Sequence, residues 1–271
     1  MSMSIPELER ALRALRLSGM ITTLQARAQQ VAHQQMDFVE AFSWLVQDEL
    51  DRRRSRLLER RFALSGLTER KDLKDFDWTY NPKLPKRDIL DITTLKFIEA
   101  RDGALLIGPP GTGKSHIAKS IAQLALQRGY KVLYREAHVL LEEINEAREL
   151  GELREYRAQL LVIDDLFLRK LPSNAGDELA DVLMSRYEKL STVITSNRTI
   201  DDCPKLLGDV VVVTPLLDRI MHRGHLLKFD GKLATEGSGR ASCQTRRRRV
   251  IIPPSRCCLV GDFDPATGGG I

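Results

Sequence analysis

The feature that most constrains the fold of this chain is the run Gly108-Pro109-Pro110-Gly111-Thr112-Gly113-Lys114-Ser115. It fits the pattern G-x-x-x-x-G-K-[ST] in full, and it lies between an apolar segment at 104–108 that favours a strand and a segment at 116–128 that favours a helix. In this setting the glycines let backbone N–H groups turn towards phosphate oxygens, and the helix N-terminus favours negative charge. The sequence therefore predicts a loop that binds the phosphates of a nucleotide.

The chemistry of this loop gives roles to two of its side chains. Lys114 would reach the β- and γ-phosphates of ATP, and Ser115 would place its hydroxyl on Mg²⁺. ATP and Mg²⁺ are therefore the expected cofactors. The residues expected to contact the nucleotide are Gly108, Pro109, Pro110, Gly111, Thr112, Gly113, Lys114, Ser115 and His116.

A second motif, at 160–165, is an apolar strand that ends in two carboxylates. If this strand lies beside the strand before the loop, Asp164 would hold Mg²⁺, usually through water. Asp165 would then orient or deprotonate the attacking water. Taken alone, two aspartates after a strand more often cap a helix or form a turn. The phosphate-binding loop about fifty residues earlier favours the catalytic interpretation.

Three further side chains could complete such a site. Asn197 ends an apolar strand at 192–197, and its amide could bond the γ-phosphate or the water; the alternative is a turn residue. Arg219 and Arg223 are four apart near a helix expected at about 215–222, and they share a face. Either could reach the γ-phosphate bound to a neighbouring subunit. Alone, each would more simply be a solvated or salt-bridged arginine.

The segment at about 1–75 is rich in Leu, Arg and Gln, and we expect a helical N-terminal domain there. Ser4 and Glu7 resemble a capping box at the start of the first helix. Asp37 is the N-cap candidate of a long second helix, and Gly19 and Gly66 mark expected breaks.

The remaining chain divides into two segments of different kind. Between 76 and 232 apolar strands alternate with amphipathic helices, which favours an α/β domain with a parallel sheet covered on both faces. Its first ten residues, 76–85, hold two prolines and several aromatic side chains. We expect an extended segment that packs on this domain, with a contact to the nucleotide base as the alternative. The tail at 233–271 shows no sustained period and is expected to be disordered.

Charge and hydropathy limit the possible partners and locations. The net charge is +5, but the tail alone holds six arginines against three carboxylates, so affinity for nucleic acid would need a local patch. Arg52–Arg61 offers one, with Arg53, Arg56 and Arg60 on one face. A solvated face paired with Asp48, Glu49, Asp51 and Glu59 explains it equally well. The sequence shows neither a secretory signal nor a membrane-spanning run, so a cytoplasmic location is expected.

Together these motifs resemble AAA+ ATPases, and in particular the helicase-loader group that includes DnaC and the IstB transposition helpers. The resemblance is carried by GPPGTGKSHIAKSIA, LLVIDDL, TSNR and LLDRIMHR, with LRLSGM and FDWTYNP nearer the N-terminus, over about residues 5–232. It implies a five-stranded sheet in AAA+ order, ATP hydrolysis, and self-assembly with ATP between subunits. It also implies delivery of double-stranded target DNA to a cognate transposase. On this pattern Asn197 is sensor 1, and Arg219, then Arg223, is preferred for the arginine finger.

Two departures from the family pattern affect the expected activity. The acidic motif usually ends Asp-Glu, but here it ends Asp164-Asp165, so slow hydrolysis is expected. The family-like ending is also missing after Gly231-Lys232, and we hypothesise that the tail is out of frame or foreign. The sequence leaves open a replicative helicase loader and a non-hydrolysing, ATP-gated interaction protein as alternatives.

Overall fold

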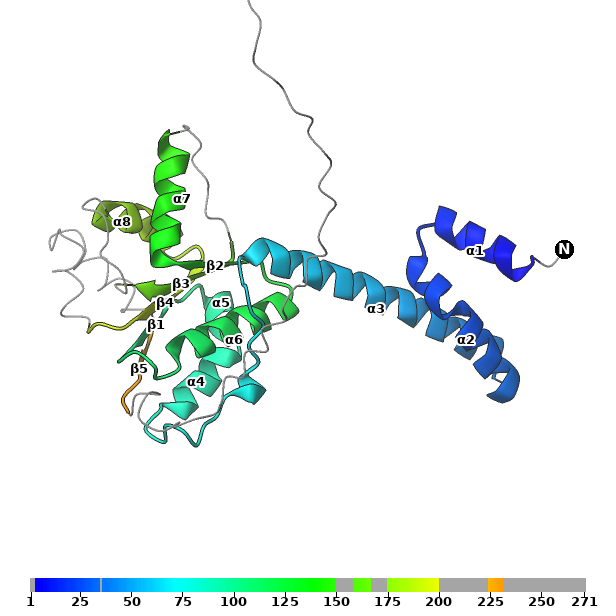
Figure 1. The fold of residues 1–271 in the computed structure, drawn as a ribbon, viewed down its shortest axis with the longest axis horizontal. Helices are drawn as coiled ribbons and strands as arrows, with labels where there is room; N and C mark the ends of the chain where they lie inside the picture. Colours follow the sequence, from blue (N-terminus) through cyan, green and yellow to red (C-terminus); the bar gives the residue numbers. More distant parts are fainter. Residues whose placement is uncertain (1–2, 35, 150–157, 167–174, 200–223, 232–271) are drawn as a thin grey trace, which may run out of the picture. The chain divides into compact units, whose positions relative to one another are not determined.

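The computed structural model describes residues 3–34, 36–149, 158–166, 175–199 and 224–231 (Figure 1). All of them belong to one unit, Met1–Glu236. The expected helix at about 215–222, both candidate finger arginines and the tail at 233–271 lie outside the described residues. The domain boundaries at 75 and 232 stay predictions.

A five-stranded parallel sheet forms the centre of the fold. In sheet order its strands are β2 (Val132–Glu136), β3 (Leu160–Leu166), β4 (Ser191–Ser196), β1 (Ala104–Ile107) and β5 (His225–Lys228). Every residue of β1 and β4 is buried, as expected for parallel strands covered on both faces. The predicted fold class and strand order are confirmed.

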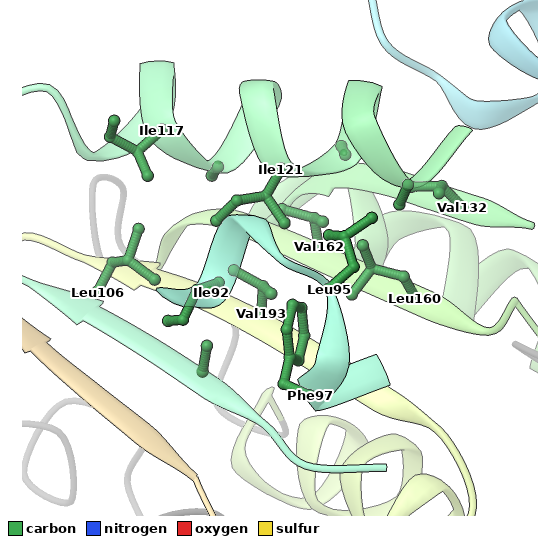
Figure 2. Packing of buried hydrophobic residues seen from close by; sticks show 14 of the residues in the cluster. Ile92, Leu95, Phe97, Leu106, Ile117, Ile121, Val132, Leu160, Val162 and Val193 are labelled. Atoms are coloured by element: carbon green, nitrogen blue, oxygen red, sulfur yellow. The ribbon is translucent and has the colours of Figure 1, made fainter. Parts of the chain in front are cut away.

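The alternation of side chains along each strand divides the core into two layers. Leu106, Val162 and Val193 face α6 (Lys114–Gln127) together with α4 (Lys86–Thr93) and α5 (Lys96–Ala100) (Figure 2). Their neighbours Leu105, Leu161 and Ile194 face α7 (Ala137–Glu149) and α8 (Ala175–Arg186). Helices therefore cover both faces of the sheet (Figure 1).

The N-terminal region contains three helices: α1 (Ile5–Ala14), α2 (Ser18–Gln34) and α3 (Phe38–Ser65). Both predicted helix starts are present, since Ser4 and Glu7 form a capping box and the Asp37 side chain accepts a hydrogen bond from the N–H of Val39. Gly66 ends α3 at a φ of 81°, which a glycine adopts without strain. The helical character of this region is thus as expected.

Gly19 does not mark the expected break but lies inside α2. The chain turns earlier, at Leu15–Leu17, where Arg16 has a φ of 58°. Gly19 serves a different purpose: its N–H donates to the buried carboxylate of Glu49 on α3, at 2.5 Å. The absence of a side chain lets α2 and α3 approach at this point.

Other differences from the expected elements concern short helices and ends. A 3-10 turn, Leu73–Asp75, and the helices α4 and α5 were not expected from the sequence. The sequence predicts a helix over residues 177–190, whereas α8 ends four residues earlier at Arg186, which is buried. Its guanidinium donates to the carbonyls of Ala158 and Ser191, at 2.9 and 2.6 Å, and so joins the loop before β3 to the start of β4. None of the helices in the described part of the chain is long and apolar enough to cross a membrane.

We predict that Gly19→Ala destabilises the protein, although alanine favours a helix by about 1 kcal/mol over glycine. A Cβ at this position would lie 2.7 Å from the Cα of Glu49 and 3.0 Å from the carbonyl oxygen of Asp48, so backbone must move. We expect a net loss of about 1–2 kcal/mol in urea unfolding. Ala26→Gly, on an exposed part of α2, is the control for propensity alone. A Gly19→Ala variant more stable than the parent would contradict the close packing of α2 on α3.

Candidate nucleotide-binding site

The loop between β1 and α6 has the conformation that its glycines allow. Gly113 has a φ of 94°, and a Cβ there would lie 2.8 Å from the ring of Phe76. Gly108 has a φ of 153°, and its Cβ would lie 2.2 Å from the carbonyl oxygen of Phe229. Thr112 closes the turn by donating its hydroxyl to the carbonyl of Pro109, at 2.8 Å. A side chain at either glycine would therefore displace the loop.

The linker before this domain packs against the same loop. The ring of Phe76 meets His116 edge-on, with centroids 5.2 Å apart, and meets Trp78 at 4.9 Å. His116 also lies 3.3 Å from the carbonyl oxygen of Asp72 through its Nε2. Phe76 and Trp78 are partly buried against the core layer that faces α6. These contacts favour the packing interpretation of the linker.

Lys114 is 5% exposed and curls over the loop. Its ammonium donates to the carbonyl of Pro109, at 2.7 Å. Burial lowers the pKa of Lys114, and the negative charges of Asp165 and Asp164 partly oppose that shift. A buried ammonium bonded to a neutral carbonyl would gain from an anionic partner such as a phosphate.

Asp164 is 2% exposed and is held by hydroxyl groups from three elements. The hydroxyl of Ser115 donates to its Oδ1, at 3.0 Å, and Thr195 on β4 donates to the same oxygen. The hydroxyl of Tyr134 on β2 donates to Oδ2. The carboxylate is thus fully bonded although water is excluded.

Asp165 points away from this network because β3 bulges at the two acids. The register with β4 passes from Ile163–Ile194 to Leu166–Ser196, so β3 holds one residue more than β4 across this interval. Asp165 takes a φ of 55°, and its N–H donates to the hydroxyl of Thr195, at 2.9 Å. Burial first, and then the charge of Asp164, raise the pKa of Asp165. A bulge that re-aims a carboxylate is common beside active sites.

A pocket of about 400 Å³ brings most of the candidate residues together. It is lined by Pro110, Gly111, Gly113, Lys114, Ser115, His116, Asp165 and Asn197. Gly108, Pro109 and Thr112 shape the loop behind it, and Asp164 lies beneath Ser115. Arg219 and Arg223 lie outside the described residues. Residues from three separate segments of the sequence therefore face one cavity.

The residues present fit ATP and Mg²⁺. The side-chain oxygen of Asn197 is buried at the pocket and has no hydrogen-bond partner within the described ranges, so a ligand donor could satisfy it. Ser115 and Asp164 supply oxygen ligands of the kind that Mg²⁺ prefers. No group of three or more His, Cys, Asp or Glu suited to a metal occurs among the described residues. Mg²⁺ is usually held by one or two carboxylates together with phosphates.

Sequence reasoning missed Tyr134 and Thr195, the two hydroxyls that hold Asp164. Tyr134 belongs to no motif, the TSNR motif gives no role to its Thr195, and each lies on a strand that is adjacent to β3 only in space. The one available signal is that both are polar side chains inside expected strands, where buried polar atoms need partners. That signal identifies candidates without naming what they bind.

Comparisons with known proteins agree with this geometry. The model of the IstB-like ATP binding protein family matches residues 10–236. A Mycobacterium tuberculosis protein, named as an ATP-binding protein in an insertion sequence, is 33% identical over 237 residues, which are 85% of this chain and 94% of that protein. One from Geobacillus stearothermophilus, named as an ATP-binding protein of insertion sequence IS5376, is 31% identical over 80% of this chain and 89% of its own length.

Two solved structures are similar in fold. DnaI has a TM-score of 0.50 at 21% identity, over 59% of this chain and 92% of its own. The replication initiator DnaA, bound to AMPPCP and single-stranded DNA, also has a TM-score of 0.50 at 21% identity. That match covers 62% of this chain and 52% of DnaA.

We predict that Asp165→Asn stabilises the fold at neutral pH. Because the pKa of Asp165 is raised on folding, the folded protein binds this proton more tightly than the unfolded chain does. Its contribution to stability is therefore complete below the unfolded pKa of about 4 and is lost as the pH rises through the folded pKa. The variant should melt at a higher temperature than the parent at pH 7–8, and the two should converge towards pH 4.

Asp77→Asn is the control for this comparison, because we expect it to change the stability at neutral pH in the opposite direction. Hydrogen bonds from the Thr79 hydroxyl and N–H lower the pKa of Asp77. Its contribution to stability is present above the unfolded pKa and is lost as the pH falls through the folded pKa. The Asp77→Asn variant should therefore be less stable than the parent at neutral pH. Equal changes in melting temperature in both variants would show that burial does not govern the pKa of Asp165.

Proposed function

The chain belongs to the family of IstB-like ATP binding proteins, and we propose that it is an ATP-hydrolysing helper of DNA transposition. The observation that carries the proposal is the single pocket onto which Lys114, Asp165 and Asn197 open. Phosphoryl transfer to water requires a group that activates the water, a cation that binds the phosphates and a polar group that orients them. Asp165, Lys114 and Asn197 provide these groups at one cavity.

The residues of the site divide the work of hydrolysis. The backbone of the loop and Lys114 bind the phosphates, and the buried ammonium offsets charge on the β- and γ-phosphates. Ser115 and Asp164 would hold Mg²⁺, which supplies charge neutralisation of the phosphates when it is bound. Asp165 orients the attacking water and accepts its proton, and its raised pKa brings the carboxylate closer to that task. The side-chain oxygen of Asn197 can accept a hydrogen bond from the attacking water, or its amide nitrogen can donate one to the γ-phosphate.

Two features bear on the rate and the assembly. Asp165 is one methylene shorter than the glutamate usual at this position of AAA+ proteins, so we expect slow turnover. An arginine of a neighbouring subunit, Arg219 or Arg223, completes the site in a homo-oligomer with ATP between subunits. The nucleotide would then control how long that assembly lasts on target DNA.

The names of the relatives support the proposed role in transposition and the proposed partners. Those compared above are named as ATP-binding proteins of insertion sequences, which favours transposition over replication as the setting. We therefore propose double-stranded target DNA and a cognate transposase as partners. A transposase gene beside the gene for this chain would agree with that choice, and a replication operon would favour the helicase-loader alternative.

We predict that Lys114→Ala strongly reduces ATP turnover. Loss of the buried ammonium removes a charge that stabilises the transferred phosphoryl group, so we expect a fall of about 10²–10³-fold in kcat. Phosphate release should be measured with and without duplex DNA. Lys131→Ala, which removes an exposed lysine at the start of β2, is the matched control. Turnover by the parent no greater than that of Lys114→Ala would leave the non-hydrolysing, ATP-gated protein as the better description.

The ion pairs of α3 favour two of its arginines, Arg56 and Arg60, as DNA contacts. Three of the carboxylates that could neutralise them are paired elsewhere: Asp48 with Arg27, Asp51 with Arg54 and Glu59 with Arg70. Glu49 pairs with Arg53 and also binds the N–H of Gly19. These pairs engage part of the basic run and leave the rest of it without a carboxylate partner, which supports a DNA contact by that remaining part.

Arg56 and Arg60 are the arginines that remain on that face. Both are exposed, and neither has an ion pair or a hydrogen bond to any residue in the described part of the chain. They lie four residues apart on α3, so they project from the same side of the helix. Two neighbouring free guanidinium groups can contact successive phosphates of a nucleic acid.

We predict that the double substitution Arg56→Gln/Arg60→Gln weakens binding to duplex DNA and flattens its salt dependence. Each lost phosphate contact should reduce the slope of log K against log salt by about 1. Arg10→Gln/Arg13→Gln on α1 removes the same charge and is the control. Equal loss in both double variants would mean that only net charge matters and that α3 is not the DNA-binding surface.

A further inference from the structure

We propose that Tyr134 is a positioning residue for the candidate metal site, and that its hydroxyl fixes Asp164 in the orientation that receives Mg²⁺. This inference rests on the proposed function. Tyr134 lies on β2, where it pairs with Val162 of β3. Asp164 is two residues further along β3 and so faces the same side of the sheet. The long side chain of Tyr134 therefore reaches the acid diagonally across two strands.

The three hydroxyls on Asp164 are not equivalent. Ser115 is itself the candidate metal ligand, so its bond to Oδ1 would be replaced when a cation binds. Thr195 also serves Oδ1, and its oxygen accepts the N–H of Asp165 as well. Oδ2 receives its hydrogen bond from Tyr134. Tyr134 is thus the donor that holds the second oxygen whether or not Ser115 turns towards a metal.

A neutral donor suits this position better than a cation. An arginine or lysine would neutralise Asp164 and compete with the metal, whereas a hydroxyl orients the carboxylate and leaves its negative charge available. A tyrosine phenol is protonated at neutral pH, so the Tyr134 hydroxyl remains a donor. The Nζ of Lys119 lies 5.9 Å from the centroid of the same ring. The ring also belongs to the core layer that faces α6, which fixes the direction of the hydroxyl.

This arrangement resembles the outer shell of other metal sites. Residues that bond to a ligating carboxylate orient it, and their loss typically lowers metal affinity or activity by about 10–100-fold. The metal-binding carboxylate itself is still present after such a loss. Removing the Tyr134 hydroxyl should therefore be felt through Mg²⁺ rather than through the nucleotide.

The test compares Tyr134→Phe with Tyr130→Phe. The first substitution removes one oxygen and keeps the ring in the core. The second makes the same change at Tyr130, which lies in the loop after α6. The Tyr130 hydroxyl donates to Glu99 at 3.3 Å, and neither residue lines the pocket. Binding of a fluorescent ATP analogue should be titrated with Mg²⁺ and repeated in EDTA, and ATP turnover should be followed over the same Mg²⁺ range.

For Tyr134→Phe we expect the Mg²⁺ concentration at half-maximal nucleotide binding to rise roughly tenfold or more. Binding in EDTA should match the parent, and turnover at saturating Mg²⁺ should stay within about threefold, because excess cation offsets the weaker site. Tyr130→Phe should behave as the parent. Tyr134→Met, which fills the core without a hydroxyl, should give the same shift and serves if the phenylalanine variant folds poorly.

An unchanged Mg²⁺ midpoint in Tyr134→Phe, or equal shifts in the two tyrosine variants, would overturn the proposal. So would weaker binding of the analogue in EDTA, since that would show general damage to the pocket. The outcome is separable from that of the proposed function: a parent that binds nucleotide with Mg²⁺ but does not turn it over would remove the ATPase and leave the role of Tyr134 standing.

Discussion

The buried carboxylate of Asp164 is the constraint on which the rest of the site depends. A carboxylate excluded from water must recover its hydrogen bonds from the protein, and here α6, β2 and β4 each provide one hydroxyl. Because these donors come from separate elements, the network is complete only when the sheet and α6 are packed together. The geometry of the site therefore depends on the packing of the core.

Strand order explains why the chemical groups meet. The phosphate-binding loop follows β1, the two aspartates end β3, and Asn197 follows β4, which lies between them. In a parallel sheet the carboxyl ends of neighbouring strands share one edge, and this is where α/β proteins bind their ligands. The bulge in β3 then separates the two acids: one faces the hydroxyl network and the other the pocket.

The C-terminal end of α3 and the linker after it contact elements that carry residues of the site. The guanidinium of Arg135, which follows Tyr134 on β2, donates to the carbonyl of Ser65 at the end of α3, at 3.3 Å. Phe76 covers Gly113 of the loop. The segment between Ser65 and Phe76 is therefore in contact at one end with β2 and at the other with the phosphate-binding loop. The exposed arginines of α3 belong to the same helix.

Local patterns were enough to predict the helical start of the chain, the alternating strands and helices, and the residues of the loop, because spacing and composition report those directly. The strand order itself came only through the family resemblance. Gly19 was misjudged since a glycine in a helix signals a break unless a neighbouring helix is known to need the space. Tyr134 and Thr195 were invisible for a similar reason. Their partner is distant in sequence, and only the pairing of β2 and β4 with β3 decides that two ordinary hydroxyls hold the acid at the centre of the site.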